Sequence, residues 1–404
     1  MREALICGAV RTAVGRYGGA VRTVNAEELA GRVVAAVVER YELPEQSIDD
    51  VIFGQCYPNG EAPAMGRLAA LRAGLPIEVP GFQVDRRCGS GLQSVCLAAM
   101  EVQTGVADLI LAGGVESMSN TEHYTLDMRW GPTRGHVTMY DRLDRGRVTV
   151  GCESRFMVEG GMLETAENLR AQYDISREEQ DEYALRSHQR AVAALDEGKF
   201  KDYIVPIPVP QKKGEDVIFD RDEHPRPGTT METLAALKPV RAKMDADATV
   251  TAGNASGEND GAAVSIIASP EAAKRFGLKP LAVLRSWSAA GVHPAYMGIG
   301  PVPAAKKALD RLGLSLKDMD LIELNEAFAS QVLAVTREWG FGAADFERMN
   351  VNGSGISLGH PVGATGVRIL ADMLAEMERR NARYALETMC IGGGQGIAAV
   401  FERA

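Results

Sequence analysis

The stretch GFQVDRRCGSGLQSVCLAAMEVQ, residues 81–103, combines a short strand, a turn of small residues and a helix. Residues 81–84 are typical of a strand, and apolar side chains from Leu92 onwards recur at helical spacing. Cys88 stands in the turn, where the unpaired N–H groups of a helix start favour a thiolate. The neighbouring glycines leave its sulfur open to a substrate. Cys88 is therefore a candidate nucleophile, although a cysteine in a turn can also be a small core residue.

Three segments of the C-terminal half place a chemically useful side chain at the end of an element. Asn325 follows an apolar run. His360 precedes a helix expected at residues 367–378, and Cys390 follows a strand expected at residues 384–389. Taken alone, Asn325 is also typical of a turn, His360 of a helix cap and Cys390 of a buried core position. Together with the candidate thiol they indicate nucleophilic catalysis with its own proton acceptor.

The order of expected elements in the first half recurs in the second half. Strand, helix, strand, small-residue turn with its helix, and strand follow one another over residues 3–114 and again over residues 281–394. Such a repeat predicts two related α/β halves packed about a pseudo-twofold axis. In that arrangement Cys88 and His360 would hold equivalent positions and face one another.

The region between the halves has no counterpart in the repeat. It contains a Gly/Arg-rich stretch at residues 129–147 and a helix expected at residues 177–197. Long irregular regions of this kind are ligand-binding segments or structural and oligomer-contact loops. The predicted organisation is an N-terminal half at residues 1–120 and 252–272, a loop domain at residues 121–251, and a C-terminal half at residues 273–404.

Two expected helices begin with a capping-box pattern, in which a small polar residue is followed three positions later by glutamate. The pairs are Asn25 with Glu28 and Ser176 with Glu179. Each pair is expected to satisfy backbone N–H groups in the first turn of its helix.

Composition limits the class of function. The chain has 404 residues, of which 46% are hydrophobic and 24% charged, as in soluble globular proteins. A net charge of −10 without basic runs disfavours a nucleic-acid partner. No apolar stretch reaches the roughly 18 residues of a membrane span, no signal peptide is visible, and no metal-site spacing occurs. Six scattered cysteines indicate reduced thiols and hence a cytoplasmic protein.

Seven phrases, distributed over the whole chain, resemble in identity and order those of the thiolase family of acetyl-CoA C-acyltransferases. They are CGSGLQ (88–93), AGGVESMS (112–119), TAGNASG (251–257), MGIGPVP (297–303), NEAF (325–328), GHPVGATG (359–366) and CIGGGQG (390–396). The resemblance implies the thiolase fold, in which two α/β halves form a five-layer α/β/α/β/α core with an inserted loop domain. It also implies a homodimer or homotetramer.

The resemblance implies reversible thiolytic cleavage of 3-ketoacyl-CoA by coenzyme A, or Claisen condensation of acetyl-CoA with acyl-CoA. Either direction serves fatty acid β-oxidation or acetoacetyl-CoA formation and passes through an acyl-Cys88 intermediate. His360 resembles the base that activates this thiol, and Cys390 resembles the second acid/base. Asn325 resembles the residue that fixes a water, which forms one oxyanion hole with His360. The backbone N–H groups of Cys88 and Gly392 would form the other.

Coenzyme A and acyl-CoA are thus the implied partners, with no tightly bound cofactor and no metal. The residues that match the family's substrate and coenzyme A contacts are Arg226, Thr233, Ser256, Met162, Met297 and Phe328. Arg226 matches an arginine near the adenine nucleotide, although alone it reads as a solvated charge. Ser256 matches a serine on the pantetheine arm, and the two methionines match residues of the acyl pocket.

Three positions depart from the pattern of many relatives. Asp85 replaces an asparagine three residues before the nucleophile, and it would raise the thiol pKa unless it pairs with Arg86 or Arg87. Gly161 replaces a histidine, and Glu164 stands where an apolar residue is common. These departures leave the acyl-chain specificity open.

Three other functions share parts of this pattern. A condensing enzyme of the ketoacyl-ACP-synthase type shares the fold but is expected to lack the phrase at residues 390–396. A lipid-carrier-type thiolase usually replaces the phrase at residues 325–328, which is retained here. A catalytically silent acyl-CoA-binding protein would have lost a catalytic residue, and none is lost.

Overall fold

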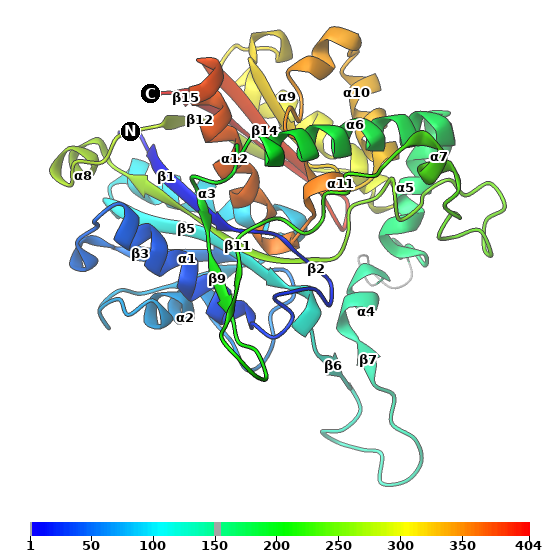
Figure 1. Cartoon of the computed structure of the whole chain (residues 1–404), viewed down its shortest axis with the longest axis horizontal. Helices are drawn as coiled ribbons and strands as arrows, with labels where there is room; N and C mark the ends of the chain where they lie inside the picture. The colour runs from blue at the N-terminus through cyan, green and yellow to red at the C-terminus, as the bar shows by residue number, and fades with distance from the viewer. Residues whose placement is uncertain (1, 149–154) are drawn as a thin grey trace.

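The computed structural model describes residues 2–148 and 155–404. Helices form the two outer layers and the middle layer, and two half-sheets lie between them (Figure 1). The elements of the N-terminal half are β1 (Leu5–Thr12), β2 (Gly15–Arg16), α1 (Ala26–Arg40), β3 (Asp50–Gly54), α2 (Met65–Arg72), β4 (Phe82–Val84), α3 (Ser90–Thr104), β5 (Leu109–Ser117), β11 (Asn259–Ala268) and α8 (Pro270–Arg275). Those of the C-terminal half are β12 (Ala282–Gly291), α9 (Pro301–Asp310), β13 (Leu321–Leu324), α10 (Ala329–Glu338), α11 (Gly355–Leu358), α12 (Thr365–Arg380), β14 (Tyr384–Ile391) and β15 (Gln395–Arg403).

The two half-sheets have the same strand order. In the first, β4, β3 and β5 are parallel, and β11 and β1 follow antiparallel. In the second, β13 and β14 are parallel, and β15 and β12 follow antiparallel. Where the first half has β4, the second has a single parallel bridge between Ile322 and Met349. The half-sheets join where Leu5 and Ile6 of β1 pair with β12. The layered α/β architecture expected from the repeat is confirmed.

The middle layer consists of α3 and α12, which pack against each other and against both half-sheets. Glycines allow this close approach. A Cβ on Gly114 would lie 2.1 Å from the carbonyl oxygen of Gly363, and a Cβ on Gly366 would lie 2.2 Å from the backbone nitrogen of Leu92. Real Cβ atoms do not tolerate such contacts, so larger residues would push the layers apart. The crossing brings the starts of the two helices together, and with them the candidate catalytic residues.

The expected equivalence of Cys88 and His360 is wrong in detail. A 3₁₀ helix, Arg87–Gly89, leads into α3, and a corresponding 3₁₀ helix, Val362–Ala364, leads into α12. Gly363, not His360, therefore holds the position that corresponds to Cys88. The histidine reaches the same place from the preceding loop.

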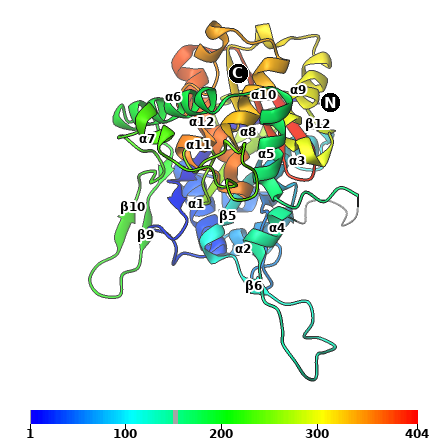
Figure 2. The same cartoon turned by 90° about the vertical axis from the view of Figure 1, so that its right-hand side faces the viewer.

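The segment between β5 and β11 covers one side of the middle layer and extends beyond it. Its elements are β6 (His123–Tyr124), β7 (Tyr140–Asp141), α4 (Arg142–Val148), α5 (Gly161–Gln172), α6 (Arg177–Asp196), β8 (Ile204–Val205), β9 (Ile207–Val209), β10 (Val217–Phe219) and α7 (Met231–Ala235). Figure 2 shows the hairpin of β9 and β10 and the excursion carrying β6 standing away from the layers. No helix in the described residues is both long and apolar enough to cross a membrane.

The two capping predictions have different outcomes. The hydroxyl of Ser176 accepts from the N–H of Glu179 (3.1 Å), whose carboxylate accepts from the N–H of Ser176 (2.7 Å), so this capping box is confirmed. Asn25 makes no side-chain cap to α1, so the other prediction is wrong.

Candidate active site

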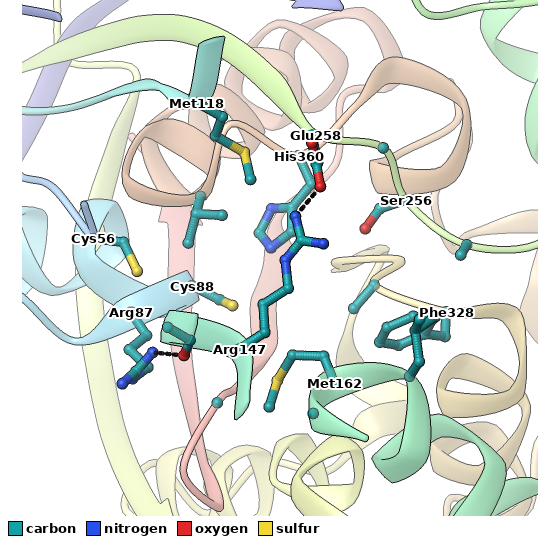
Figure 3. A pocket seen from close by; sticks show the side chains of 18 of the residues that line it. Cys56, Arg87, Cys88, Met118, Arg147, Met162, Ser256, Glu258, Phe328 and His360 are labelled. Carbon is teal, nitrogen blue, oxygen red and sulfur yellow. Dashed lines mark hydrogen bonds and ion pairs between the residues drawn. The ribbon is translucent and has the colours of Figure 1, made fainter. Parts of the chain in front are cut away.

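A cavity of about 260 Å³ lies where α5 and the end of α4 cover the starts of the two middle-layer helices (Figure 3). Its wall includes segments from both halves and from the intervening region. The expected site residues that line it are Cys88, His360, Gly392, Ser256, Met162, Met297 and Phe328. Residues from distant parts of the chain therefore meet in one place.

Cys88 presents a partly exposed thiol to this cavity. Burial raises the pKa of the thiol above its usual value, although hydrogen bonding from the N–H of Gly392 and the Arg87 charge oppose this rise. The backbone N–H of Cys88 itself also lowers the thiol pKa. Desolvation thus outweighs the expected effect of the helix start, and the resting group is a thiol. The nucleophile therefore needs a base.

His360 can act as that base, because its hydrogen bonds select one tautomer. The hydroxyl of Thr365 donates to the carbonyl of Pro361 (3.0 Å), so its oxygen accepts from Nδ1–H of His360 (2.6 Å). Nε2 then carries the lone pair, and it has no hydrogen-bond partner among residues 2–148 and 155–404. Burial, followed by the Arg368 charge, lowers the pKa of His360 to about 3. The imidazole is therefore neutral at physiological pH and free to accept a proton.

The backbone of His360 is held by Asn259, the first residue of β11. The His360 N–H donates to Oδ1 of Asn259 (2.8 Å), whose amide donates to the carbonyl of Gly15 (2.9 Å). The preceding Gly359 has a φ of +96°, and a Cβ there would lie 2.7 Å from the Asn259 side chain. Only glycine fits this approach.

Cys390 and Asn325 lie just behind the cavity wall. Cys390 is the penultimate residue of β14, is fully buried, and packs in a cluster with Met162, Met297 and Phe328. Burial and the nearby Cys88 raise the pKa of its thiol well above the usual value. Asn325 follows β13 and is fully buried, and in the part of the chain that the structure describes neither polar atom of its carboxamide has a hydrogen-bond partner. An unpaired buried amide is costly, so this group fits a role in holding a small polar species.

Arg226 and Thr233 are not brought to the cavity. Both side chains are exposed on the intervening region. The hydroxyl of Thr233 accepts from the N–H of Thr230 (2.9 Å) and completes the cap of α7. Their expected contacts with coenzyme A stay predictions.

Two of the three departures have local explanations. The Asp85 carboxylate accepts from the backbone N–H of Arg87 (2.7 Å), and the expected pairing with an arginine guanidinium is not found among the described residues. Glu164 accepts from the N–H of Gly160 (2.7 Å) and forms an ion pair with Arg241 (3.3 Å). Glu164 thus secures the start of α5 and does not line the cavity.

Several lining residues were missed from the sequence. They are Cys56, Tyr57, Arg87, Met118, Arg147, Leu163 and Glu258. Arg147 ends the Gly/Arg-rich stretch, and Glu258 directly follows the phrase at residues 251–257, so position next to a motif was the available signal. These two side chains form an ion pair.

Glu116, within the phrase at residues 112–119, stabilises backbone segments around the site. Its carboxylate accepts from the N–H groups of Cys56 (3.0 Å), Tyr57 (3.0 Å) and Gly363 (2.8 Å). Burial raises its pKa to about 7, against these hydrogen bonds. Glu116 thereby links the N-terminal half to the C-terminal half next to the site.

The arrangement suits acyl transfer. A thiol, a neutral imidazole and converging backbone N–H groups share one cavity, and a second thiol lies behind it. In the described residues, no group of three His, Cys, Asp or Glu side chains is placed to hold a metal ion. The thiols and the imidazole that meet here supply nucleophilic and acid–base chemistry.

Comparison with known proteins agrees with this chemistry. The family model "Thiolase, N-terminal domain" matches residues 4–271, and "Thiolase, C-terminal domain" matches residues 278–403. The chain is 46% identical over 412 residues to an acetyl-CoA acetyltransferase of Pseudomonas aeruginosa, covering 100% of both chains. It is also 46% identical over 403 residues to the beta-ketothiolase BktB of Cupriavidus necator, covering 100% of this chain and 99% of that one.

Solved structures give the same result. The acetyl-CoA acetyltransferase of Bacillus anthracis superposes with a TM-score of 0.94 at 44% identity, covering 100% of this chain and 99% of that one. Human mitochondrial 3-ketoacyl-CoA thiolase superposes with a TM-score of 0.92 at 41% identity, with the same coverage. The chain therefore belongs to the thiolase family, as its seven phrases indicated, and is a coenzyme A-dependent acyltransferase with the thiolase fold.

Proposed function

We propose that this thiolase cleaves 3-ketoacyl-CoA with coenzyme A, and condenses acetyl-CoA with acyl-CoA in reverse, using Cys88 as nucleophile and His360 as its base. The observation that carries these roles is the cavity in which a histidine with a free Nε2 and a thiol hydrogen-bonded by the Gly392 N–H lie together. Coenzyme A enters as a substrate, and the family uses no tightly bound cofactor.

In thiolysis, Nε2 of His360 takes the Cys88 proton and the sulfur attacks the 3-keto carbon. The N–H groups of Cys88 and Gly392 stabilise the resulting oxyanion. The bond between C2 and C3 then breaks, and the acetyl-CoA enolate takes a proton from Cys390. The raised pKa of Cys390 suits this step, because it keeps the group as a thiol ready to donate.

Between the half-reactions, the proton that His360 took from Cys88 passes to the Cys390 thiolate. In the second half-reaction, Nε2 of His360 takes the proton of the coenzyme A thiol, whose sulfur attacks acyl-Cys88. The Cys88 sulfur leaves and regains its proton from His360. This half-reaction exchanges one thioester for another, so it is nearly balanced in energy. Asn325 would hold a water that, with His360, stabilises the enolate oxygen.

The proposal extends to coenzyme A binding, the oligomeric state and the compartment. Residues 121–251 would form the loop domain that binds coenzyme A, with Arg226 and Thr233 at the nucleotide end and Ser256 on the pantetheine arm. Ser256 lines the same cavity as Cys88, which supports its role. We also propose a homodimer or homotetramer in the cytoplasm, where the nucleophilic thiol stays reduced.

A direct assay tests the activity: thiolysis of acetoacetyl-CoA, followed by loss of its enolate absorbance. Cleavage that depends on free coenzyme A supports the proposal. A ketoacyl-ACP-synthase-type enzyme would instead require acyl carrier protein, and a silent acyl-CoA-binding protein would show binding without turnover.

Replacing His360 by asparagine should slow the alkylation of Cys88 by iodoacetamide at pH 7 about 10²-fold, because the proton acceptor is lost. With its pKa near 3, His360 is in its base form throughout pH 5–9. In the variant, the rate should depend on the thiolate fraction alone and rise about tenfold per pH unit. The two rates should therefore converge only at high pH.

The matched control is His188→Asn, which removes another buried histidine of lowered pKa outside the cavity. Its alkylation profile should equal that of the wild type. Coincident profiles for wild type and His360→Asn would show that His360 does not activate Cys88.

Replacing Asn325 by alanine should lower kcat for acetoacetyl-CoA thiolysis by roughly 10²-fold, because an oxyanion donor is lost. Acetylation of Cys88 by acetyl-CoA should be retained, since that step produces no enolate. Equal losses in both measurements would show that Asn325 acts through the fold and not on the enolate.

A further inference from the structure

An ion pair crosses the catalytic cavity and has no role in the chemistry proposed above. Arg147 lies in the last turn of α4 in the intervening region, and Glu258 directly precedes β11 in the layered body. Their side chains are joined, and both line the cavity with Cys88 and His360. Figure 3 shows the Arg147 side chain running past Cys88 and Met162 toward Glu258. Two charged side chains thus occupy space in a pocket whose lining also includes Met118, Met162, Met297 and Phe328.

Glu258 is held by the rigid core. Its carbonyl accepts from the N–H of Tyr17 (3.0 Å), and the next residue, Asn259, holds the backbone of His360 (2.8 Å). The backbone of Glu258 is therefore fixed relative to the strand that positions the base.

Arg147 is held by two side chains, and the backbone of its neighbour is held by a third. Its guanidinium interacts with Tyr57 as well as with Glu258, and Glu258 raises its pKa despite the opposing effect of burial. The carbonyl of the preceding Gly146 accepts from the guanidinium of Arg87 (2.9 Å), next to the nucleophile. These contacts fix the end of α4 over the cavity.

Gly161 makes room for this arrangement. Its φ is +59°, and a Cβ there would lie 2.9 Å from the carbonyl oxygen and 3.3 Å from the Cβ of Arg147. A side chain at position 161 would therefore press on Arg147. The departure at Gly161 and the ion pair are parts of one local structure.

We propose that the Arg147–Glu258 ion pair is a specificity determinant that restricts the acyl substrate to short chains. The inference rests on the proposed thiolase reaction and adds its substrate class. The cavity of about 260 Å³ is already smaller than the roughly 300–1,000 Å³ of typical small-molecule sites. A longer alkyl chain would have to displace the pair or leave methylenes without room, and both outcomes oppose binding.

The expected wild-type behaviour is a steep fall of kcat/KM as 3-ketoacyl-CoA lengthens from four to eight carbons. Glu258→Ala and Arg147→Ala should each raise the ratio of kcat/KM for the eight-carbon substrate to that for the four-carbon substrate by at least about tenfold. One methylene in an apolar pocket changes selectivity by roughly 10–200-fold, so this change is within reach. A ratio of two rates on one preparation does not depend on the fraction of protein that folds.

The structure offers a matched control on the same helix. Arg142 of α4 pairs with Glu122 (2.7 Å), and these side chains are 32% and 34% exposed, against 32% and 33% for Arg147 and Glu258. The Arg142–Glu122 pair does not line the cavity. Glu122→Ala should therefore leave the chain-length ratio within about twofold of wild type.

Three outcomes separate the possibilities. A ratio that rises in the Arg147 and Glu258 variants but not in Glu122→Ala supports the inference. Equal losses for all chain lengths, or a ratio that matches the control, overturn it and leave the thiolase reaction intact. If the wild type cleaves no 3-ketoacyl-CoA of any length, the proposed function itself fails.

Discussion

Cys88→Ser is expected to abolish both acetylation by acetyl-CoA and thiolysis, with kcat falling by at least about 10⁴-fold. Acetyl-CoA alone should acetylate the wild-type enzyme and release coenzyme A, because the first half-reaction needs no second substrate. A serine hydroxyl has a far higher pKa than a thiol and is a poorer leaving group, so neither half-reaction can proceed at a useful rate. Intact-protein mass spectrometry reports the added acetyl group, and peptide mapping locates it.

Cys56→Ala is the control for that experiment. Cys56 lines the same cavity, but burial and the Glu116 carboxylate raise the pKa of its thiol well above the usual value. The variant should still gain one acetyl group on Cys88. An acetyl group found on Cys56 or Cys390 in the wild type would show that the nucleophile has been assigned wrongly.

Cys390→Ala is expected to separate the two half-reactions. The variant should still be acetylated on Cys88 at close to the wild-type rate, because that step needs only His360 and the backbone N–H groups. Thiolysis and condensation should fall by about 10⁴-fold, since both require proton transfer at the carbon of the acetyl-CoA enolate. Pre-steady-state release of coenzyme A measures the first step, and acetoacetyl-CoA turnover measures the whole reaction.

Cys96→Ala is a suitable comparison, because Cys96 is another fully buried thiol of the middle layer that does not line the cavity. It should leave turnover within a few-fold of wild type. If Cys390→Ala lost acetylation and turnover to the same extent, Cys390 would be a structural residue of the cluster behind the cavity.

The sequence predicted most of the α/β frame, because long apolar runs and helical spacing reflect burial directly. The helix expected at residues 92–103 is α3, Ser90–Thr104, and the helix expected at residues 367–378 is α12, Thr365–Arg380. The ends of these helices were predicted less accurately than their centres, because the residues of the first turn depend on tertiary contacts. The strand β15, Gln395–Arg403, was not anticipated, although its Ile397, Val400 and Phe401 favour a strand.

The identities of the candidate catalytic residues also came from the sequence, through motif phrases and their order. Their protonation states and their exact positions could not be predicted from it. The helix start suggested a lowered thiol pKa for Cys88, but desolvation by the surrounding layers raises it. His360 was expected at a position equivalent to Cys88, but a 3₁₀ turn offsets it. Both errors arise because burial and local offsets depend on how separate layers pack.

The chain alone thus determined two related α/β halves, a thiol at a helix start, and the histidine, second thiol and asparagine that accompany it. Those features follow from local patterning and from residues that stand next to one another in sequence. The tautomer of His360, the orphaned carboxamide of Asn325 and the Arg147–Glu258 pair across the cavity were decided by the tertiary structure. Each arises from groups brought together by the crossing of α3 and α12 or by the region that covers it, and contacts between such distant segments have no signature in a single sequence.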